Sequence, residues 1–204
     1  MAFYEVAGRR PRVHPSAFVH PLASLIGDVE VGPGCYIGAG ACLRADWLSI
    51  RVGAGSNVQD SCTVHGYPGV IVVLEEGTHM GHGSIVHGAH VGRNVLVGMN
   101  AVVQDDADLG EGCVVGSGCV VPAGMHVPAG TLVVGVPGRI VGEVSAELRA
   151  GKIEGTKWYQ GLTRRCLTEF VAVEETECLS EDAGERGWMP WAGRDAELPE
   201  DFFR

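Results

Sequence analysis

The sequence predicts an all-β solenoid of short parallel strands, followed by a C-terminal α-helix. Two observations lead to this prediction: aliphatic residues recur every six positions over most of the chain, and glycine is unusually frequent. Glycine makes up 31 of the 204 residues, about twice its average share of ~7%. Without a period, this much glycine would favour disorder. With a period, it indicates turns placed at fixed intervals along the chain.

The six-residue spacing defines the expected strands. A strand places alternate residues on one face, so a period of six suits a strand and does not suit the 3.6-residue period of a helix. Three short strands separated by turns close one triangular coil, and stacked coils align the inward aliphatics into a continuous core. Twenty such positions, taken three to a coil, predict between six and seven coils. They are Val13, Val19, Leu25, Val31, Ile37, Leu43, Val52, Val58, Val64, Leu74, Met80, Val86, Val91, Val97, Val103, Leu109, Val115, Val121, Val127 and Val133.

The C-terminal part of the chain changes character. Ser145 is a suitable helix N-cap, and Glu147 in the first turn favours the positive end of a helix. We expect this helix to be broken or divided near Gly151 and Gly155, because glycine weakens helices. The last thirty residues carry nine acids and three bases, a composition typical of irregular segments. The predicted parts are the solenoid with residues 10–140, the helix with 141–174 and the acidic tail with 175–204.

Charge and cysteine content exclude several classes of protein. Fifteen Lys and Arg against 25 Asp and Glu give a net charge of −10, which disfavours nucleic acids and anionic membranes as partners. No apolar run reaches the ~20 residues of a membrane helix, and the first residues lack a signal-peptide pattern. The seven cysteines form no Cys-x-x-Cys pair and indicate free thiols in a reducing compartment. We therefore expect a cytoplasmic protein.

Three of the eight histidines stand out by their place in the repeat. His65 and His87 each follow an inward aliphatic residue directly, and His82 lies two residues after one. Three neutral imidazoles with an open fourth position are the pattern of a catalytic zinc site, although spacing alone does not establish one. His79 and His90 flank this set; they could line the pocket, but surface turns are the expectation.

Three segments resemble the motifs of the gamma-class carbonic anhydrases, a hexapeptide-repeat family. They are Leu43-Arg44-Ala45-Asp46, Asn57-Val58-Gln59-Asp60-Ser61-Cys62-Thr63-Val64-His65 and Gly81-His82-Gly83-Ser84-Ile85-Val86-His87-Gly88. The resemblance covers roughly residues 10 to 175 and implies that the coils of the solenoid wind left-handed. It also implies a homotrimer with metal sites between subunits. His65 and His87 would come from one chain and His82 from the next.

The resemblance implies roles for further residues and for the metal. Arg44 and Asp46 match a pair that forms an intersubunit salt bridge, and Gln59 matches the residue that hydrogen-bonds the metal-bound water. Asn57 and Asp60 match polar positions around that water. Tyr159 matches an aromatic residue that the family places on a helix near the metal cleft, although a role in packing alone would also explain this residue. Three neutral nitrogens suit Zn²⁺, while iron, cobalt and nickel also accept imidazole ligands.

A closer resemblance lies within this family, to its branches from phenylacetate degradation and the carnitine operon. The matching stretches are Ser24 to Val29, Val97 to Val103, Gly155 to Gln160 and Thr163 to Cys166. The last two fall outside the repeat, where packing does not force the sequence. The phenylacetate branch implies a metal-dependent acyl-CoA thioesterase of aromatic catabolism, in which a metal-bound hydroxide attacks the thioester carbonyl.

Other functions stay open at this point. Fast hydration of carbon dioxide needs a proton relay, and the loop Gly66–Gly69 lacks the Glu that serves this purpose in the prototype carbonic anhydrase. We therefore expect that activity to be weak or absent. Hexapeptide acyltransferases use one catalytic His without a metal, whereas three histidines and the Arg, Asp and Gln motifs occur here. A non-catalytic subunit that carries a metal is the remaining alternative.

Overall fold

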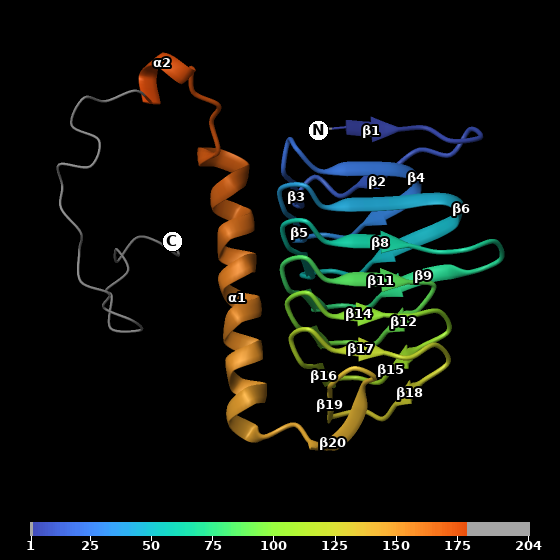
Figure 1. Ribbon diagram of the computed structural model, residues 1–204. Coiled ribbons are helices and arrows are strands. Elements are labelled where there is room, and N and C mark those ends of the chain that lie inside the picture. Colours follow the sequence, from blue (N-terminus) through green and yellow to red (C-terminus); the bar gives the residue numbers. More distant parts are fainter. Residues whose placement is uncertain (1, 179–204) are drawn as a thin grey trace.

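The computed structural model describes residues 2–178 and shows a left-handed parallel β-solenoid with a long helix along one side (Figure 1). The prediction from the six-residue period is confirmed. Every one of the predicted inward aliphatics is buried except Val13, which is partly buried against the core. The coils stack in register, so that Val64, for example, pairs with Val86 of the next coil and with Leu43 of the previous one.

The strands stack into three faces, one for each side of the triangular coil. The apolar face contains β8 (Thr63–His65), β11 (Ile85–His87), β14 (Val102–Val103) and β17 (Val120–Val121). The charged face contains β2 (Arg12–Val13), β9 (Ile71–Leu74), β12 (His90–Val91), β15 (Asp108–Leu109) and β18 (His126–Val127). The covered face contains β3 (Phe18–Val19), β5 (Tyr36–Ile37), β7 (Asn57–Val58), β10 (His79–Met80), β13 (Leu96–Val97), β16 (Val114–Val115) and β19 (Thr131–Val134).

Two long strands turn the corner between the apolar and charged faces. They are β4 (Ser24–Val31) and β6 (Cys42–Val52). The first half of β6 pairs with β8, and its second half pairs with β9. The strand β1 (Ala2–Tyr4) adds to the start of β4, so the sheet begins before the predicted boundary at residue 10.

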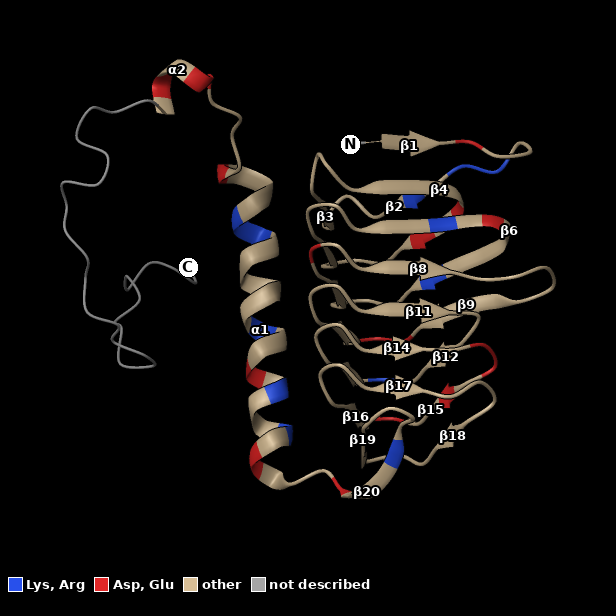
Figure 2. Ribbon diagram, viewed as in Figure 1, with Lys and Arg blue, Asp and Glu red and all other residues tan. Residues whose placement is uncertain are grey.

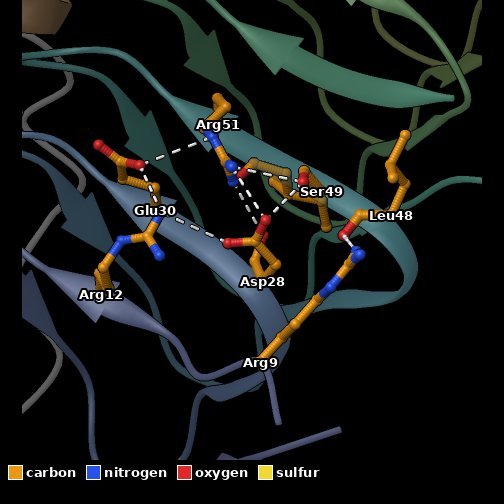
Figure 3. A network of polar contacts seen from close by, with 8 residues as sticks. Arg9, Arg12, Asp28, Glu30, Leu48, Ser49 and Arg51 are labelled. Carbon is orange, nitrogen blue, oxygen red and sulfur yellow. Dashed lines mark hydrogen bonds and ion pairs between the residues drawn. The ribbon is translucent and has the colours of Figure 1, made fainter. Parts of the chain in front are cut away.

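The outward residues differ between the apolar and charged faces. Figure 2 shows no Lys, Arg, Asp or Glu on β8, β11, β14 and β17, and Ile85 on β11 is 37% exposed. On the charged face, ion pairs link neighbouring coils (Figure 3). Arg51 donates to Asp28 at 2.9 Å, and Arg12 donates to Glu30 at 2.9 Å. The strands β8, β11, β14 and β17 carry no such pair of basic and acidic side chains among their own outward residues, and their carboxylate contacts are those of His65 and His87.

The helix α1 (Ala146–Glu169) lies against the covered face and contacts β3, β5 and β7. Its predicted cap is confirmed, because the Ser145 hydroxyl accepts a hydrogen bond from the Leu148 N–H at 3.1 Å. The predicted break near Gly151 and Gly155 was wrong. The helix continues because it is held by packing on the solenoid, with the side chains of Lys152, Thr156 and Thr163 buried.

The end of the solenoid differs from the predicted boundary at residue 140. The strand β20 (Arg139–Glu143) turns back and pairs antiparallel with β19, so the last strand extends past that boundary and the helix begins at residue 146. Gly135 and Gly138 form backbone hydrogen bonds with Val120 on the apolar face. The predicted irregular tail starts with a short helix, α2 (Glu175–Cys178), and its remainder lies outside the described residues. Within residues 2–178, no helix is both long and apolar enough to cross a membrane.

Candidate functional site

The predicted site residues form two clusters on opposite edges of the apolar face. The first cluster, the imidazole pair with its supports, consists of His65, His87, Arg44 and Asp46. The second, the amide cluster, consists of Asn57, Gln59, Asp60, His82 and Tyr159. The structure therefore brings the predicted residues together in two groups rather than one.

Strand register explains the first cluster. Arg44, His65 and His87 occupy aligned positions on β6, β8 and β11, in three consecutive coils. Each lies one residue after a buried aliphatic, so its side chain points outward from the strand. The six-residue spacing found in the sequence thus places these three side chains side by side.

The two imidazoles face each other. The distance from His65 Nδ1 to His87 Nε2 is 3.1 Å. Their outer nitrogens contact carboxylates: His65 Nε2 lies 2.9 Å from Asp46 Oδ1, and His87 Nδ1 contacts Asp105. A carboxylate on one ring nitrogen favours a proton there, which leaves the other nitrogen as a lone-pair donor. Two such donors facing each other fit a shared cation, so these residues are compatible with a metal ligand set.

Arg44 and Asp46 support His65 from the preceding coil. The Arg44 guanidinium forms an ion pair with Asp46 and lies 3.3 Å from His65 Nδ1. Burial alone would raise the pKa of Asp46, but hydrogen bonds from His65 and Arg44 lower it below its usual value. Asp46 therefore stays ionised and holds the outer nitrogen of His65 as a proton donor.

Two contributors to this cluster were missed in the sequence. Asp105 follows His87 by 18 residues, the length of one regular coil, and this spacing could have indicated the contact. Tyr67 lies in the loop Gly66–Gly69, and its ring stacks on His87 with centroids 6.4 Å apart. Its hydroxyl donates to Asp106, two coils further along the solenoid. The loop thus covers one side of the imidazole pair.

Gln59 is the centre of the amide cluster and is only 3% exposed. Its amide nitrogen donates to Asn57 Oδ1 at 3.0 Å and lies 2.6 Å from His79 Nε2. Its amide oxygen accepts the backbone N–H of His82 at 3.2 Å. Because both amide hydrogens are engaged, Gln59 can offer a further partner only its oxygen.

His79 was expected on a surface turn, and this expectation was wrong. It lies on β10 under α1, aligned with Asn57, and its ring packs edge-on against Tyr159 at 5.5 Å. Burial, with smaller effects of Lys152 and His82, lowers its pKa to about 4, so the ring is neutral at pH 7. The sequence held a signal: Tyr36, Asn57 and His79 each precede an inward aliphatic and are spaced about one coil apart, which places them on one face. His90, expected on a turn, lies on β12 instead.

His82 is held by its neighbours at the edge of the amide cluster. Its Nδ1 lies 3.2 Å from Asp60 Oδ2, and its Nε2 lies 3.5 Å from the Tyr159 hydroxyl. Burial raises the pKa of Tyr159 to about 12, so that hydroxyl keeps its proton. The side chain of His82 is 48% exposed and thus accessible from outside the chain.

The chain by itself does not gather the three predicted ligands. His82 lies in the turn before β11, whereas His87 ends this strand. The contacts of His82 are to Asp60 and Tyr159, and none reaches the imidazole pair. In the part of the chain that the structure describes, no three His, Cys, Asp or Glu side chains converge so that they could hold a metal.

Comparison with known proteins gives consistent matches. A family described as bacterial transferase hexapeptide (six repeats) matches residues 10–45 and 88–123. Carnitine operon protein CaiE of Escherichia coli (strain SMS-3-5 / SECEC) is 44% identical over 186 residues, which covers 91% of this chain and 93% of that protein. CaiE of strain K12 is 45% identical over 179 residues, 88% of this chain and 90% of that protein.

Two solved structures resemble most of this chain. A putative acetyltransferase from Bacillus cereus superposes with a TM-score of 0.80 and 30% identity, covering 82% of this chain and 97% of that chain. A hexapeptide transferase family protein from Anaplasma phagocytophilum gives a TM-score of 0.77 and 32% identity, covering 80% and 96%. The similarity therefore extends over nearly the full length of these relatives.

Proposed function

Because the chain belongs to the hexapeptide-repeat family, among relatives of carnitine operon protein CaiE, we propose that it is a metal-dependent acyl-CoA thioesterase of the gamma carbonic anhydrase-like type. Its sites would be completed between copies of the chain in a homotrimer. The acyl group would come from aromatic catabolism, as in the phenylacetate branch that the sequence resembles. The observation that carries the proposal is the imidazole pair, His65 and His87, with a carboxylate on each outer nitrogen.

The ligands of the metal would be His65 and His87 of one chain and His82 of a neighbouring copy. These three histidines flank one apolar face from its two edges. In a closed ring of copies, each chain presents one edge of a face to the opposite edge of the next chain, which is a heterologous contact. Such a ring would also bury the outward residues of β11, β14 and β17, which include the exposed Ile85.

The residues around the ligands suit hydrolysis of a thioester. A divalent cation supplies Lewis acidity, which makes water a competent nucleophile near neutral pH. Gln59 offers only its amide oxygen and so can accept a hydrogen bond from that water and orient it. Tyr159, which keeps its proton, can donate to the carbonyl oxygen of the substrate as charge develops there. A thiolate leaves easily, so the site needs no strong general acid.

Mixed oligomers test the proposal directly. His82→Ala and His65→Ala should each fold, and each should lose metal and acyl-CoA hydrolysis. When the two variants are unfolded together and reassembled, some interfaces pair the intact His82 of one chain with the intact His65 and His87 of another. We expect metal content and hydrolysis to return partly in the mixture, in proportion to those interfaces.

The controls separate the possible outcomes. His65→Ala mixed with His87→Ala should restore nothing, because both defects lie on the same edge and no interface is complete. Wild-type metal content in His82→Ala alone would contradict the ligand assignment. Restored metal without thioester hydrolysis would support the shared site and reject the activity. Carbon dioxide hydration is measured on the same samples and is expected to be weak.

A second candidate function is acyl transfer from coenzyme A to an acceptor. It is favoured by the His82–Asp60 pair, because a carboxylate that orients an exposed imidazole is the arrangement of a general base. The solved relatives at 30% and 32% identity are described as a putative acetyltransferase and a hexapeptide transferase family protein. Metal-free protein that still consumes acyl-CoA only when an amine or alcohol acceptor is present would favour this function over hydrolysis.

A further inference from the structure

A cavity lies beneath the first turns of α1, away from both clusters. It has a volume of about 400 Å³ and is bounded by the helix and the turns at one corner of the solenoid. Its walls include Val114, Val144 and Ile153. Along the helix, Lys152 precedes Tyr159 by seven residues, a rise of about 10 Å. The cavity is therefore a separate feature of the fold, and the imidazole pair does not line it.

Two cations line this cavity without an acidic partner. The Lys152 side chain reaches in from α1, and the residue is only 7% exposed. Its ammonium donates to the Gly77 carbonyl at 2.6 Å and lies 3.4 Å from Asn94 Oδ1, both neutral acceptors. Arg149 lies one turn earlier on the same helix and lines the same cavity. Within residues 2–178, neither cation forms an ion pair with a carboxylate.

A buried charge is costly unless an opposite charge or several hydrogen bonds compensate for it. Two neutral acceptors satisfy two of the three N–H groups of Lys152, so one donor remains for a ligand. Burial lowers the pKa of Lys152 to about 8, which leaves the amine mostly charged at pH 7. Glu111 is the one acid on the cavity wall, so among the lining residues cations outnumber anions by two to one.

We infer that this cavity is a binding site for a small carboxylic acid with an apolar body. The carboxylate would pair with Lys152 and Arg149, and the apolar body would lie against Val114, Val144 and Ile153. The volume lies within the range of small-molecule sites. The inference does not depend on the proposed metal site or on thioester hydrolysis.

Calorimetric titration of the full chain at pH 7 tests the inference. The probe is hexanoate, and the comparison ligands are hexanol, hexylammonium and inorganic phosphate. We expect hexanoate to bind at least tenfold more tightly than each of the three. Hexanol lacks the negative charge, hexylammonium carries a positive charge, and phosphate has no apolar part to contact the apolar walls.

Variants connect binding to the cavity. Lys152→Gln and Arg149→Gln should each weaken hexanoate binding about tenfold or more, whereas Lys157→Gln on the exposed side of α1 should leave it unchanged. If Lys152→Gln proves unstable, Arg149→Gln and the methyl NMR shifts of Val114 and Val144 on hexanoate addition decide the question. No hexanoate binding in the millimolar range would overturn the inference, as would equal binding of hexanol or phosphate. Unchanged affinity in Arg149→Gln would overturn it too.

Discussion

The apolar and charged faces are made from the same repeat and yet meet their surroundings in opposite ways. Both place a buried aliphatic inward in each coil, for example Val86 on β11 and Val91 on β12. Their outward neighbours differ: Ile85 on β11 is apolar, whereas His90 on β12 lies between Asp108 and Glu75. The inward positions thus determine the solenoid, and the outward positions determine what each side of it contacts. A face whose strands carry no Lys, Arg, Asp or Glu, with histidines at both edges, is suited to contact with another copy of the chain.

The largest effect should follow from a charge placed on the apolar face. In Ile85→Glu the outward side chain of β11 becomes an acid, which no partner face can bury without a large desolvation cost. If the copies dock on this face, the oligomer should dissociate into monomers, with loss of metal and activity. Light scattering coupled to size-exclusion chromatography measures the change.

The matched control lies on the charged face. Ile71 on β9 is also an outward isoleucine and is 49% exposed. Ile71→Glu should leave the mass and activity at the wild-type level. Dissociation by both variants, or by neither, would remove the distinction between the two faces.

A smaller effect is expected from Gln59→Ala in the amide cluster. The substitution removes the acceptor for the His82 N–H and leaves Asn57 and His79 without their partner. Because Gln59 is not a ligand, metal content should stay at the wild-type level while turnover falls about 10- to 100-fold, as for other residues that orient a site. Metal analysis beside steady-state acyl-CoA hydrolysis checks this, and an unchanged rate would exclude Gln59 from the mechanism.

The pH dependence of the free energy of unfolding should show that His79 is buried in its neutral form. Its pKa is lowered to about 4 in the folded chain, below the usual 6.5, so the unfolded chain binds the proton first as the pH falls. The free energy of unfolding should therefore decrease between pH 6.5 and 4, by up to about 3 kcal/mol. Urea unfolding over this range measures it.

His79→Gln is the matched variant, since its amide oxygen can still accept from Gln59 but does not titrate. In His79→Gln the free energy of unfolding should decrease less between pH 6.5 and 4 than in the wild type, because the contribution of His79 is missing. His14→Gln, at an exposed position, should show the same decrease as the wild type. Equal slopes in wild type and His79→Gln would show that the ring is not buried as described.

The smallest effect is expected on the charged face. Asp28 contacts Arg51, Arg12 and Ser49 across neighbouring coils (Figure 3). Ion pairs of this kind contribute little, so Asp28→Asn should lower the free energy of unfolding by about 1 kcal/mol. The oligomer should stay intact, because this face is not the proposed contact. A loss of oligomer here would contradict the comparison between the faces.

The repeat allowed most of the fold to be predicted from the sequence. A period of six is compatible with few structures, and the inward aliphatics are the residues whose burial drives folding. The helix was harder, because Gly151 and Gly155 lower local helix propensity while packing against the covered face keeps α1 continuous. Helix propensity depends on neighbours in sequence, whereas this packing involves residues of the solenoid more than seventy positions away, as in the hydrogen bond from Lys152 to Gly77.

The candidate site was predictable where it follows the repeat. Arg44, His65 and His87 share one phase, so the register alone places them together. Tyr67 lies in an insertion that interrupts the repeat, and no periodic rule gives its position over His87. His79 was assigned to a turn because its burial depends on α1, an element that the repeat does not describe.

The return of β20 against β19 bears on how the protein avoids forming fibres. A stack of parallel coils ends in open strand edges, which in principle can template another stack of the same kind without limit. Here the strand at one exit of the covered face runs in the opposite direction, so a further coil would meet a reversed strand and not the parallel edge that the repeat offers. Gly135 and Gly138 occupy the edge of β17 in the same way. At these two edges the chain itself hinders the addition of a further parallel coil.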